Sequence, residues 1–461
     1  MPLILPGNVA SAIGGGYEVA NSCRFNDGDS AGLSRTFGTP SSTTTWTISF
    51  WVKKCTNGSA LNLCAQGVGT SNEDRIRFDS SDKLEWTIYK SGVEGKLVTN
   101  RVFRDPSAWY NIVCRYDSTN GTAGDRMRIF VNGTEETSFA TDTNPDQNET
   151  SNFNTAAANY VGQVDSGGEY FDGYMAEVCF IDGTALTATS FGEFDEDSPT
   201  IWKPIDVSGL TFGDNGFYLD FEDSGDLDDD ESGNSNDFTV SNLAAVDQAT
   251  DTPTNNFCTL NPLIYNPQAT TYSQGNCVWF APAAPSFERT TGTIAVSTGK
   301  WYWEALMAAA LTSHFIGVVI TNPVVPDDPM YAPGTTSFYN NDGGEIDTAG
   351  TKTTADYGTF DTDNVMGIAL DMDAGSYGQF TIYKDNSAIA SNIDLSSTTG
   401  DGFITPFVAG FGSTIAVNFG GCPGFAITSA AADENGYGTF EFAPPSGYLA
   451  LCTKNLGSDG G

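Results

Sequence analysis

Acidic residues are the first candidates for chemistry, because two carboxylates about 5 Å apart can cleave a glycosidic bond with retention. A strand that carries Glu-x-Asp-x-x-Glu presents these side chains toward one cleft. The nearest match is "GEIDTAG", in which Glu345 and Asp347 take the first two positions and Gly350 stands where the third carboxylate is needed. Because the pattern is incomplete, a glycan-degrading enzyme is the least favoured hypothesis.

Serine and histidine chemistry is also poorly represented. The segment "GDSAG" (28–32) has the Gly-x-Ser-x-Gly spacing, but it lies in a polar turn rather than between a buried strand and a helix. The only histidine is His314. A Ser–His triad and a multi-histidine metal site are therefore both disfavoured, and we expect no enzyme.

The acidic run "GDLDDDESGNSND" (225–237) raises the question of a calcium loop. Counted from Asp226, aspartates occupy positions 1, 3, 5 and 12, as in an EF-hand. The sixth position needs a sharp turn and is usually Gly, whereas in this run it is Glu231. No helical pattern flanks the run, so we predict a solvated turn of a β-hairpin, between "FYLDF" and "DFTV".

The overall charge restricts the partners. With 20 Lys and Arg against 58 Asp and Glu, the net charge of −38 disfavours nucleic acid and anionic membranes. No segment reaches the ~18 apolar residues of a membrane span. The start, "MPLILPG", lacks a basic region, and we expect a docking arm rather than a signal peptide. Nine cysteines without a CxxC predict buried thiols rather than disulfides or a zinc site.

The elements that must position these residues are strands. "TWTISFWVKK" (45–54) places Trp46, Ile48, Phe50 and Val52 on one face, the period-2 pattern of a half-buried strand. Asn132-Gly133 between apolar alternations predicts a hairpin turn. Long helical periodicity is almost absent. The chain is predicted to be all-β, with two antiparallel jelly-roll sandwiches.

The predicted order of units follows from these patterns. We expect an N-terminal docking arm (1–21), a first β-sandwich (22–203), an acidic connecting region with a β-hairpin (204–271), a second sandwich (272–425) and a C-terminal extension (426–461).

The first sandwich resembles laminin-G and concanavalin-A-like domains in "WYNIVCRYD…RIFVNG" and "FDGYMAEVCFIDGTALT". Such domains often hold one calcium ion at a sheet rim, through carboxylates and carbonyls. Carried over by position, the resemblance implies Asp27, Asp29 and Asp172 as calcium ligands. The alternative is that Asp27 and Asp29 form an ordinary turn and Asp172 ends a strand.

The second sandwich resembles SPRY domains through "GKWYWE", "DNVMGIALD", "ITPFV" and "VNFG", in that order. Its long loops are less family-like. As candidate ligand-binding residues in them we name Asn322, Asp327, Asp328, Tyr331, Tyr339, Asn340 and Asp342.

Pieces across the whole chain, including "LDDDESGNSNDFTV" and "PPSGYLALCTKNL", resemble virion proteins of tailed marine bacteriophages. This resemblance implies a virion protein, assembled in the host cytoplasm and exposed on the head or tail. The first hypothesis is a tail-fibre or receptor-binding protein that binds a host-surface glycan or protein as a homo-oligomer, with a trimer favoured for avidity. Its arm would dock on other virion proteins. The alternative is a capsid decoration, head-fibre or tail-appendage protein with an architectural role.

Overall fold

The structure is a computed structural model, and it describes most of the chain. The described residues are 4, 16–67, 72–165, 167–264, 269–283, 288–309, 314–321, 335–339, 344–348, 351–352, 355–395 and 402–459.

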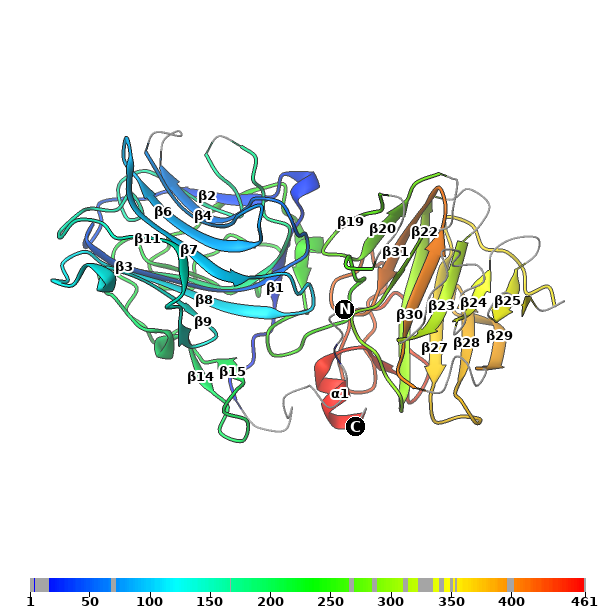
Figure 1. Cartoon of the computed structure of the whole chain (residues 1–461). Coiled ribbons are helices and arrows are strands. Elements are labelled where there is room, and N and C mark those ends of the chain that lie inside the picture. The colour runs from blue at the N-terminus through cyan, green and yellow to red at the C-terminus, as the bar shows by residue number, and fades with distance from the viewer. Residues whose placement is uncertain are drawn as a thin grey trace. The chain divides into compact units, whose positions relative to one another are not determined.

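The chain forms two compact units (Figure 1). Gly15–Thr254 forms one unit, called the N-terminal sandwich below, and Met1–Gly14 together with Asn255–Gly461 forms the other, the C-terminal sandwich. In sequence, the N-terminal sandwich is thus an insertion in the C-terminal one. Its limit at Thr254 lies well beyond position 203, where the sequence patterns place the end of the first sandwich.

The N-terminal sandwich is built from two mainly antiparallel sheets. In spatial order the first sheet contains β10 (Thr134–Glu135), β9 (Met127–Val131), β8 (Trp109–Asp117), β3 (Thr45–Lys54), β13 (Gly173–Asp182), β1 (Ser22–Phe25) and β18 (Gln248–Ala249), with β16 (Phe217–Leu219) also pairing with β13. The second sheet contains β11 (Phe139–Thr143), β7 (Val93–Val102), β6 (Lys83–Tyr89), β5 (Glu73–Phe78), β4 (Leu61–Gly67), β12 (Ala158–Val161), β2 (Gly32–Thr36) and β17 (Thr239–Ser241).

Short elements complete this unit. They are β14 (Gly192–Phe194), which pairs with β15 (Trp202–Pro204), and the 3₁₀ turns η2 (Asp27–Asp29), η3 (Ala123–Asp125), η4 (Ala188–Ser190) and η5 (Ala245–Asp247).

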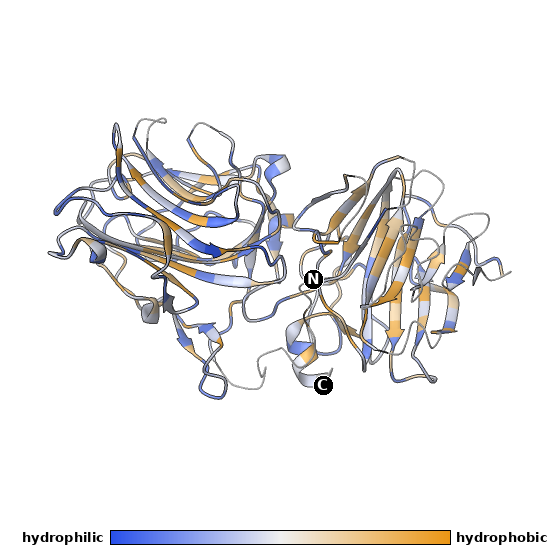
Figure 2. Ribbon diagram, in the orientation of Figure 1, coloured by the Kyte–Doolittle hydropathy of each residue, from blue (hydrophilic) through white to orange (hydrophobic). Residues whose placement is uncertain are grey.

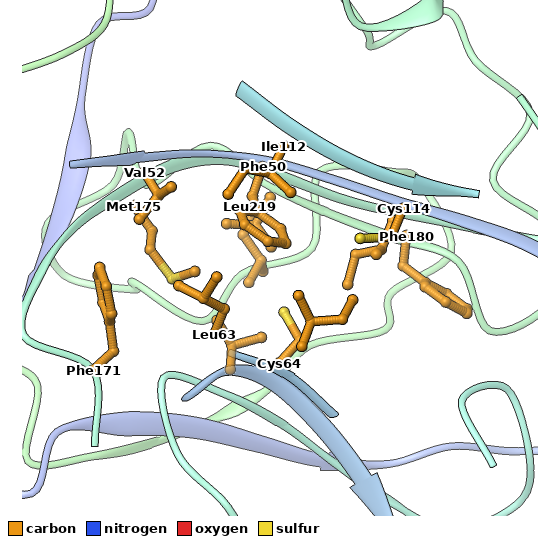
Figure 3. Close-up of a cluster of buried hydrophobic side chains, with 14 of the residues drawn as sticks. Phe50, Val52, Leu63, Cys64, Ile112, Cys114, Phe171, Met175, Phe180 and Leu219 are labelled. Carbon is orange, nitrogen blue, oxygen red and sulfur yellow. The ribbon is translucent and has the colours of Figure 1, made fainter. Parts of the chain in front are cut away.

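The core of the N-terminal sandwich lies between its two sheets. Figure 3 shows Phe50 and Ile112 of the first sheet above Leu63 and Cys64 of the second. The residues predicted to share one face of β3, from Trp46 to Val52, all belong to this core. The alternation of hydrophobic and hydrophilic residues along the strands is visible in Figure 2. Period-2 patterning therefore places the strands as expected.

The acidic run is folded into the N-terminal sandwich, and the expected hairpin does not form. β16 pairs with β13 of the first sheet, whereas β17 pairs with β2 of the second. The segment between them is anchored by the buried side chains of Phe221, Leu227 and Phe238. Asp230 accepts hydrogen bonds from the backbone N–H groups of Tyr218 (2.8 Å) and Asn236 (2.8 Å). The run therefore links the two sheets of one sandwich.

The C-terminal sandwich also consists of two sheets. The third sheet contains β19 (Thr271–Ser273), β20 (Val278–Ala281), β31 (Ser413–Asn418), β22 (Lys300–Ala309), β27 (Val365–Asp371), β28 (Gln379–Lys384) and β29 (Ser387–Asp394), with β32 (Leu449–Ala450) parallel to β22. The fourth contains β21 (Glu288–Thr291), β30 (Ile404–Gly410), β23 (His314–Ile320), β24 (Thr335–Tyr339), β25 (Glu345–Thr348) and β26 (Thr351–Lys352).

Segments from both ends of the chain complete the C-terminal sandwich. The Ile4 amide donates to the carbonyl of Thr293 (2.9 Å), and the Ala295 amide donates to the carbonyl of Ile4 (3.1 Å). At Ile4, the expected docking arm thus pairs with its own chain. On the C-terminal side, the carboxylate of Glu304 accepts from the amides of Glu441 (2.9 Å) and Phe442 (2.8 Å).

A short helix, α1 (Thr453–Asp459), follows β32. Among the described residues no helix is long and apolar enough to cross a membrane. The described fold is nearly all-β, and the prediction of two antiparallel sandwiches is confirmed.

Candidate functional site

The predicted calcium ligands lie at one rim of the N-terminal sandwich, where β13 begins. Asp172 directly precedes Gly173, whose φ of 150° lets the backbone approach β3 so closely that a Cβ would lie 2.1 Å from the carbonyl oxygen of Lys53. The Asp172 carbonyl accepts a hydrogen bond from the Cys55 amide (3.0 Å). The hydroxyl of Thr56 donates to Asp172 Oδ2. Backbone and side chain are therefore both held at the rim.

The carboxylate of Asp172 is buried and only partly satisfied. Its residue is 2% exposed, and Oδ1 has no hydrogen-bond partner among the residues that the structure describes. Burial raises the pKa of Asp172 to about 7, and the negative charge of Asp27 contributes to this increase. Asp27 and Asp172 are thus close enough to interact electrostatically, as the resemblance implies.

Asp29 is engaged in its own turn. Asp27–Asp29 form η2, which ends at Ser30 in the left-handed conformation (φ 59°). The side-chain amide of Asn26 donates to Asp29 Oδ2 (2.6 Å). Asp29 therefore shapes the loop that carries Asp27.

A calcium ion takes six to eight oxygen ligands, and the rim offers part of such a set. The described residues contain no group of three His, Cys, Asp or Glu side chains arranged to hold a metal. A buried carboxylate oxygen without a donor, beside a second carboxylate, nevertheless fits a hard cation. Asp27 and Asp172 would hold the ion, and backbone carbonyls and water would supply its other ligands.

Other buried carboxylates of this sandwich are saturated with donors, in contrast to Asp172. Asp74 accepts from the Ser151 hydroxyl (2.7 Å) and from the amides of Tyr89 (3.1 Å) and Phe153 (3.1 Å). Asp82 pairs with Lys54 and Arg104. These groups fix loops and offer no free oxygen to a ligand.

Glu177 was missed by the sequence patterns. It lies in a β-bulge of β13, between Ala176 and Cys179, with a positive φ of 51°. The hydroxyls of Tyr218 (2.9 Å) and Tyr17 (3.2 Å) donate to its Oε2. Burial raises its pKa to about 8, so it is mostly protonated at neutral pH. The bulge reverses the side-chain alternation, which is why period-2 reasoning could not place it.

The candidate ligand-binding residues of the C-terminal sandwich lie mostly outside the described residues. Only Tyr339 is described, as the last residue of β24, opposite Phe315 of β23. The others are Asn322, Asp327, Asp328, Tyr331, Asn340 and Asp342.

The remaining chemical candidates lie in strands of the fourth sheet. Glu345 and Asp347 flank the core residue Ile346 on β25, and Asp347 is buried. His314 is also buried, with its ring 5.1 Å from that of Phe360. Burial lowers the pKa of His314 to about 4, so this imidazole is neutral at physiological pH. The nine cysteines are all buried, as expected.

Comparisons with known proteins agree with the fold of the N-terminal sandwich. Residues 26–190 match the profile of the Concanavalin A-like lectin/glucanases superfamily. No curated protein matches the chain.

Three solved structures are also similar to parts of the chain. The SPRY domain of human HERC1 is 14% identical, covers 32% of this chain and 92% of its own, and has a TM-score of 0.27. A heptameric SAP-like pentraxin from Limulus polyphemus is 14% identical, and the match covers 37% of this chain and 80% of the pentraxin chain, with a TM-score of 0.28. Domains LG4-5 of the mouse laminin alpha1 chain are 9% identical, and the match covers 87% of this chain and 89% of the laminin chain, with a TM-score of 0.30.

Proposed function

We propose that this protein is a non-enzymatic adhesin that binds glycan through its N-terminal sandwich, with calcium held at the rim by Asp27 and Asp172. The observation that carries the proposal is the buried Asp172 oxygen, which has no donor among the described residues and lies near a second carboxylate. The concanavalin-A-like lectin fold of residues 26–190 supports it, because this fold is compatible with carbohydrate binding.

Calcium would supply two things at this rim. It would neutralise the repulsion between the two carboxylates, and its open coordination positions would accept hydroxyl oxygens of a sugar. The hydrogen bond from Thr56 orients Asp172 toward this role. The protein would thus gain both rim order and ligand affinity from one ion.

The biological setting that we propose is a bacteriophage virion, in which the protein serves as a tail fibre or receptor-binding protein on the particle surface. The support is the sequence resemblance to virion proteins of marine phages. The net charge of −38 also suits seawater, in which salt screens the repulsion between particles. Weak sugar sites would act together in a homo-oligomer, with three copies favoured.

The test uses the full chain on immobilised glycans and on host cells, in calcium or in a chelator. We expect binding that the chelator removes and calcium restores. Absence of binding in both conditions would reject the adhesin. Antibody labelling of intact virions then places the protein. Label on the head, with particles that become fragile when the protein is deleted, would favour the decoration protein instead.

A further inference from the structure

The outer surface of the second sheet carries an ordered set of charged side chains. Ile76 and Phe78 of β5, and Leu84 and Trp86 of β6, point into the core. Because side chains alternate along a strand, their neighbours point outward. We call one group of outward residues the polar face, and it consists of Arg75, Arg77, Glu85, Lys96 and Tyr160, together with Glu169 from the loop before β13.

Strand pairing places these residues in two adjacent rows. In one row, Arg75 lies opposite Thr87, and Thr87 lies opposite Lys96. On its other side Arg75 is opposite the small residue Ala65, which in turn is opposite Tyr160. In the second row, Arg77 lies opposite Glu85. The two arginines are two residues apart on one strand, or about 7 Å.

Ion pairs join the rows into one network. Glu85 pairs with Lys96 (2.8 Å) and Arg77 (2.9 Å). Glu169 pairs with Arg77 (2.7 Å) and Arg75 (3.5 Å). Burial opposes ionisation of Glu85, but the two cations outweigh it and hold the pKa of its carboxyl below the usual value. The network therefore fixes cationic donors beside carboxylate acceptors, and the side chains of Arg75 (29% exposed), Lys96 (29%) and Glu169 (31%) are its most exposed members.

Two features go beyond what a plain surface network needs. Glu169 has a positive φ of 49°, a conformation that non-glycine residues adopt at a cost and that is enriched at ligand sites. The side-chain oxygen of Asn62 is buried and has no hydrogen-bond partner in the described part of the chain. The backbone N–H of Asn62 donates to the Glu169 carbonyl (2.7 Å), so the backbone of β4 at Asn62 is tied to the loop that positions Glu169.

We propose that the polar face is a glycan subsite that takes neutral pyranose sugars. This inference rests on the proposed function and adds a location and a ligand class. Each sugar hydroxyl is both a donor and an acceptor, and so matches neighbouring carboxylate and guanidinium groups. The ring of Tyr160, with its hydroxyl on Asp165 (2.6 Å), offers an aromatic surface at the end of the row.

Charge decides between neutral and anionic glycans. The cations of the polar face are already paired with carboxylates, and the chain as a whole carries −38. A uronate or sulfate would gain no unpaired cation and would meet the repulsion of the acidic surface. A neutral sugar meets neither penalty.

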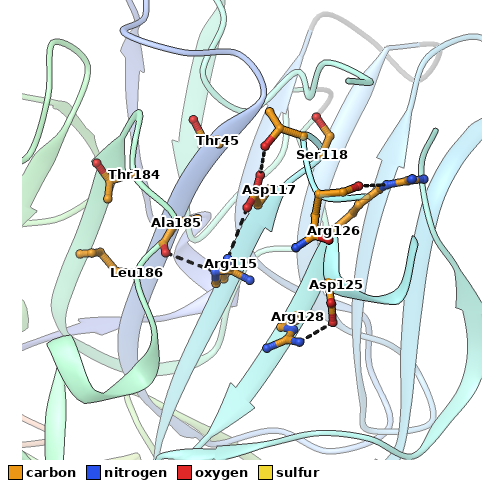
Figure 4. A network of polar contacts seen from close by, with 12 residues as sticks. Thr45, Arg115, Asp117, Ser118, Asp125, Arg126, Arg128, Thr184, Ala185 and Leu186 are labelled. Carbon is orange, nitrogen blue, oxygen red and sulfur yellow. Dashed lines mark hydrogen bonds and ion pairs between the residues drawn. The ribbon is translucent and has the colours of Figure 1, made fainter. Parts of the chain in front are cut away.

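The first sheet provides a matched control. Arg128 on β9 is partly exposed and pairs with Asp125, as Figure 4 shows. Its side chain is 30% exposed, against 29% for Arg75. Arg75→Gln and Arg128→Gln therefore remove the same charge, at nearly equal exposure, from opposite sheets of one sandwich.

The experiment measures full-chain binding, in calcium, to immobilised oligosaccharides of glucose, galactose and mannose, with uronate and sulfated oligosaccharides as a second set. We expect the wild type to prefer the neutral set. Arg75→Gln and Tyr160→Ala should each weaken binding roughly tenfold, the effect of losing one charge-assisted hydrogen bond or a stacking surface. Arg128→Gln should stay within about twofold of the wild type.

Thermal unfolding of the variants separates loss of contact from loss of fold. The assignment is overturned if the wild type binds glycan but Arg75→Gln and Tyr160→Ala bind equally well, if Arg128→Gln loses as much affinity as they do, or if the uronate or sulfated set is preferred. It is also overturned if the affinity lost tracks a lowered melting temperature. If the wild type binds no glycan at all, the proposed function fails first.

Discussion

The affinity of the rim for calcium should fall steeply between pH 7.5 and pH 5. Only ionised Asp172 can coordinate the cation, and burial together with Asp27 raises its pKa to about 7. At pH 7.5 about three quarters of the protein without calcium has this carboxylate ionised, and at pH 5 only about 1%. The apparent dissociation constant should therefore increase roughly 75-fold, or by about 2.5 kcal/mol. A carboxylate with an ordinary pKa would change the affinity by less than about 10% over the same range.

Isothermal titration calorimetry of the full chain, stripped of metal and titrated with calcium at pH 7.5, 6 and 5, checks this directly. Binding at pH 7 should also release about half a proton, which shows as a dependence of the enthalpy on the buffer. Asp172→Asn should abolish binding, whereas Asp206→Asn, an exposed carboxylate elsewhere in the sandwich, should leave it unchanged. A dissociation constant that is the same at pH 7.5 and pH 5, or tight binding by Asp172→Asn, would refute the reasoning.

Three further predictions concern stability. Burial raises the pKa of Glu177 to about 8 in the folded protein. The stability that this group contributes is therefore complete below the pKa it has in the unfolded chain, and it is lost as the pH rises toward 8. Between pH 5 and 8, this group should lower the free energy of unfolding of the wild type, measured in urea, by about 1.4 kcal/mol per pH unit. Glu177→Gln should remove this dependence on pH. Equal slopes for the wild type and the variant would contradict the assignment. Asp82→Asn leaves the buried ammonium of Lys54 without its carboxylate partner. The variant should lose about 3–5 kcal/mol of unfolding free energy in chemical denaturation. A loss below about 1 kcal/mol would show that the pair is not buried in solution. Deletion of residues 1–14 removes the Ile4 carbonyl that accepts from the Ala295 amide, so hydrogen exchange at Ala295 should accelerate, and unchanged protection would mean that this pairing is not formed.

Strands with a clean period of two were predictable from the sequence. The face of β3 from Trp46 to Val52 is in the core as expected. The Asn132-Gly133 turn also forms, with φ of 47° and 75°, between β9 and β10. Because these features depend on local sequence alone, they can be predicted from the sequence pattern.

Long-range pairing was not predictable in the same way. "FYLDF" and "DFTV" read as two strands of a hairpin, because sequence proximity is the only guide to partners. The structure instead pairs β16 and β17 with different sheets, since Phe221 and Leu227 anchor the intervening chain in the core. Because Phe221 and Leu227 stand among many acidic residues, the sequence pattern did not identify them as core residues.

The candidate site was predictable in part. The approach of Asp27 to Asp172 followed from a family resemblance and not from spacing. The burial of Glu177 against Tyr17 and Tyr218 could not be predicted, because an alternating sequence pattern does not reveal a bulge or a positive φ. Likewise, the polar face joins side chains of β5, β6, β7 and β12 to Glu169, and only the fold brings these distant segments together.

The most direct test of the central claim is the binding of the full chain to a glycan array in calcium and after chelation. The account predicts binding to neutral-sugar glycans in calcium, a loss of at least about tenfold in the chelator, and recovery when calcium is returned. Binding that is indifferent to the chelator would contradict the role of Asp27 and Asp172. No binding to any glycan in either condition would contradict the adhesin itself.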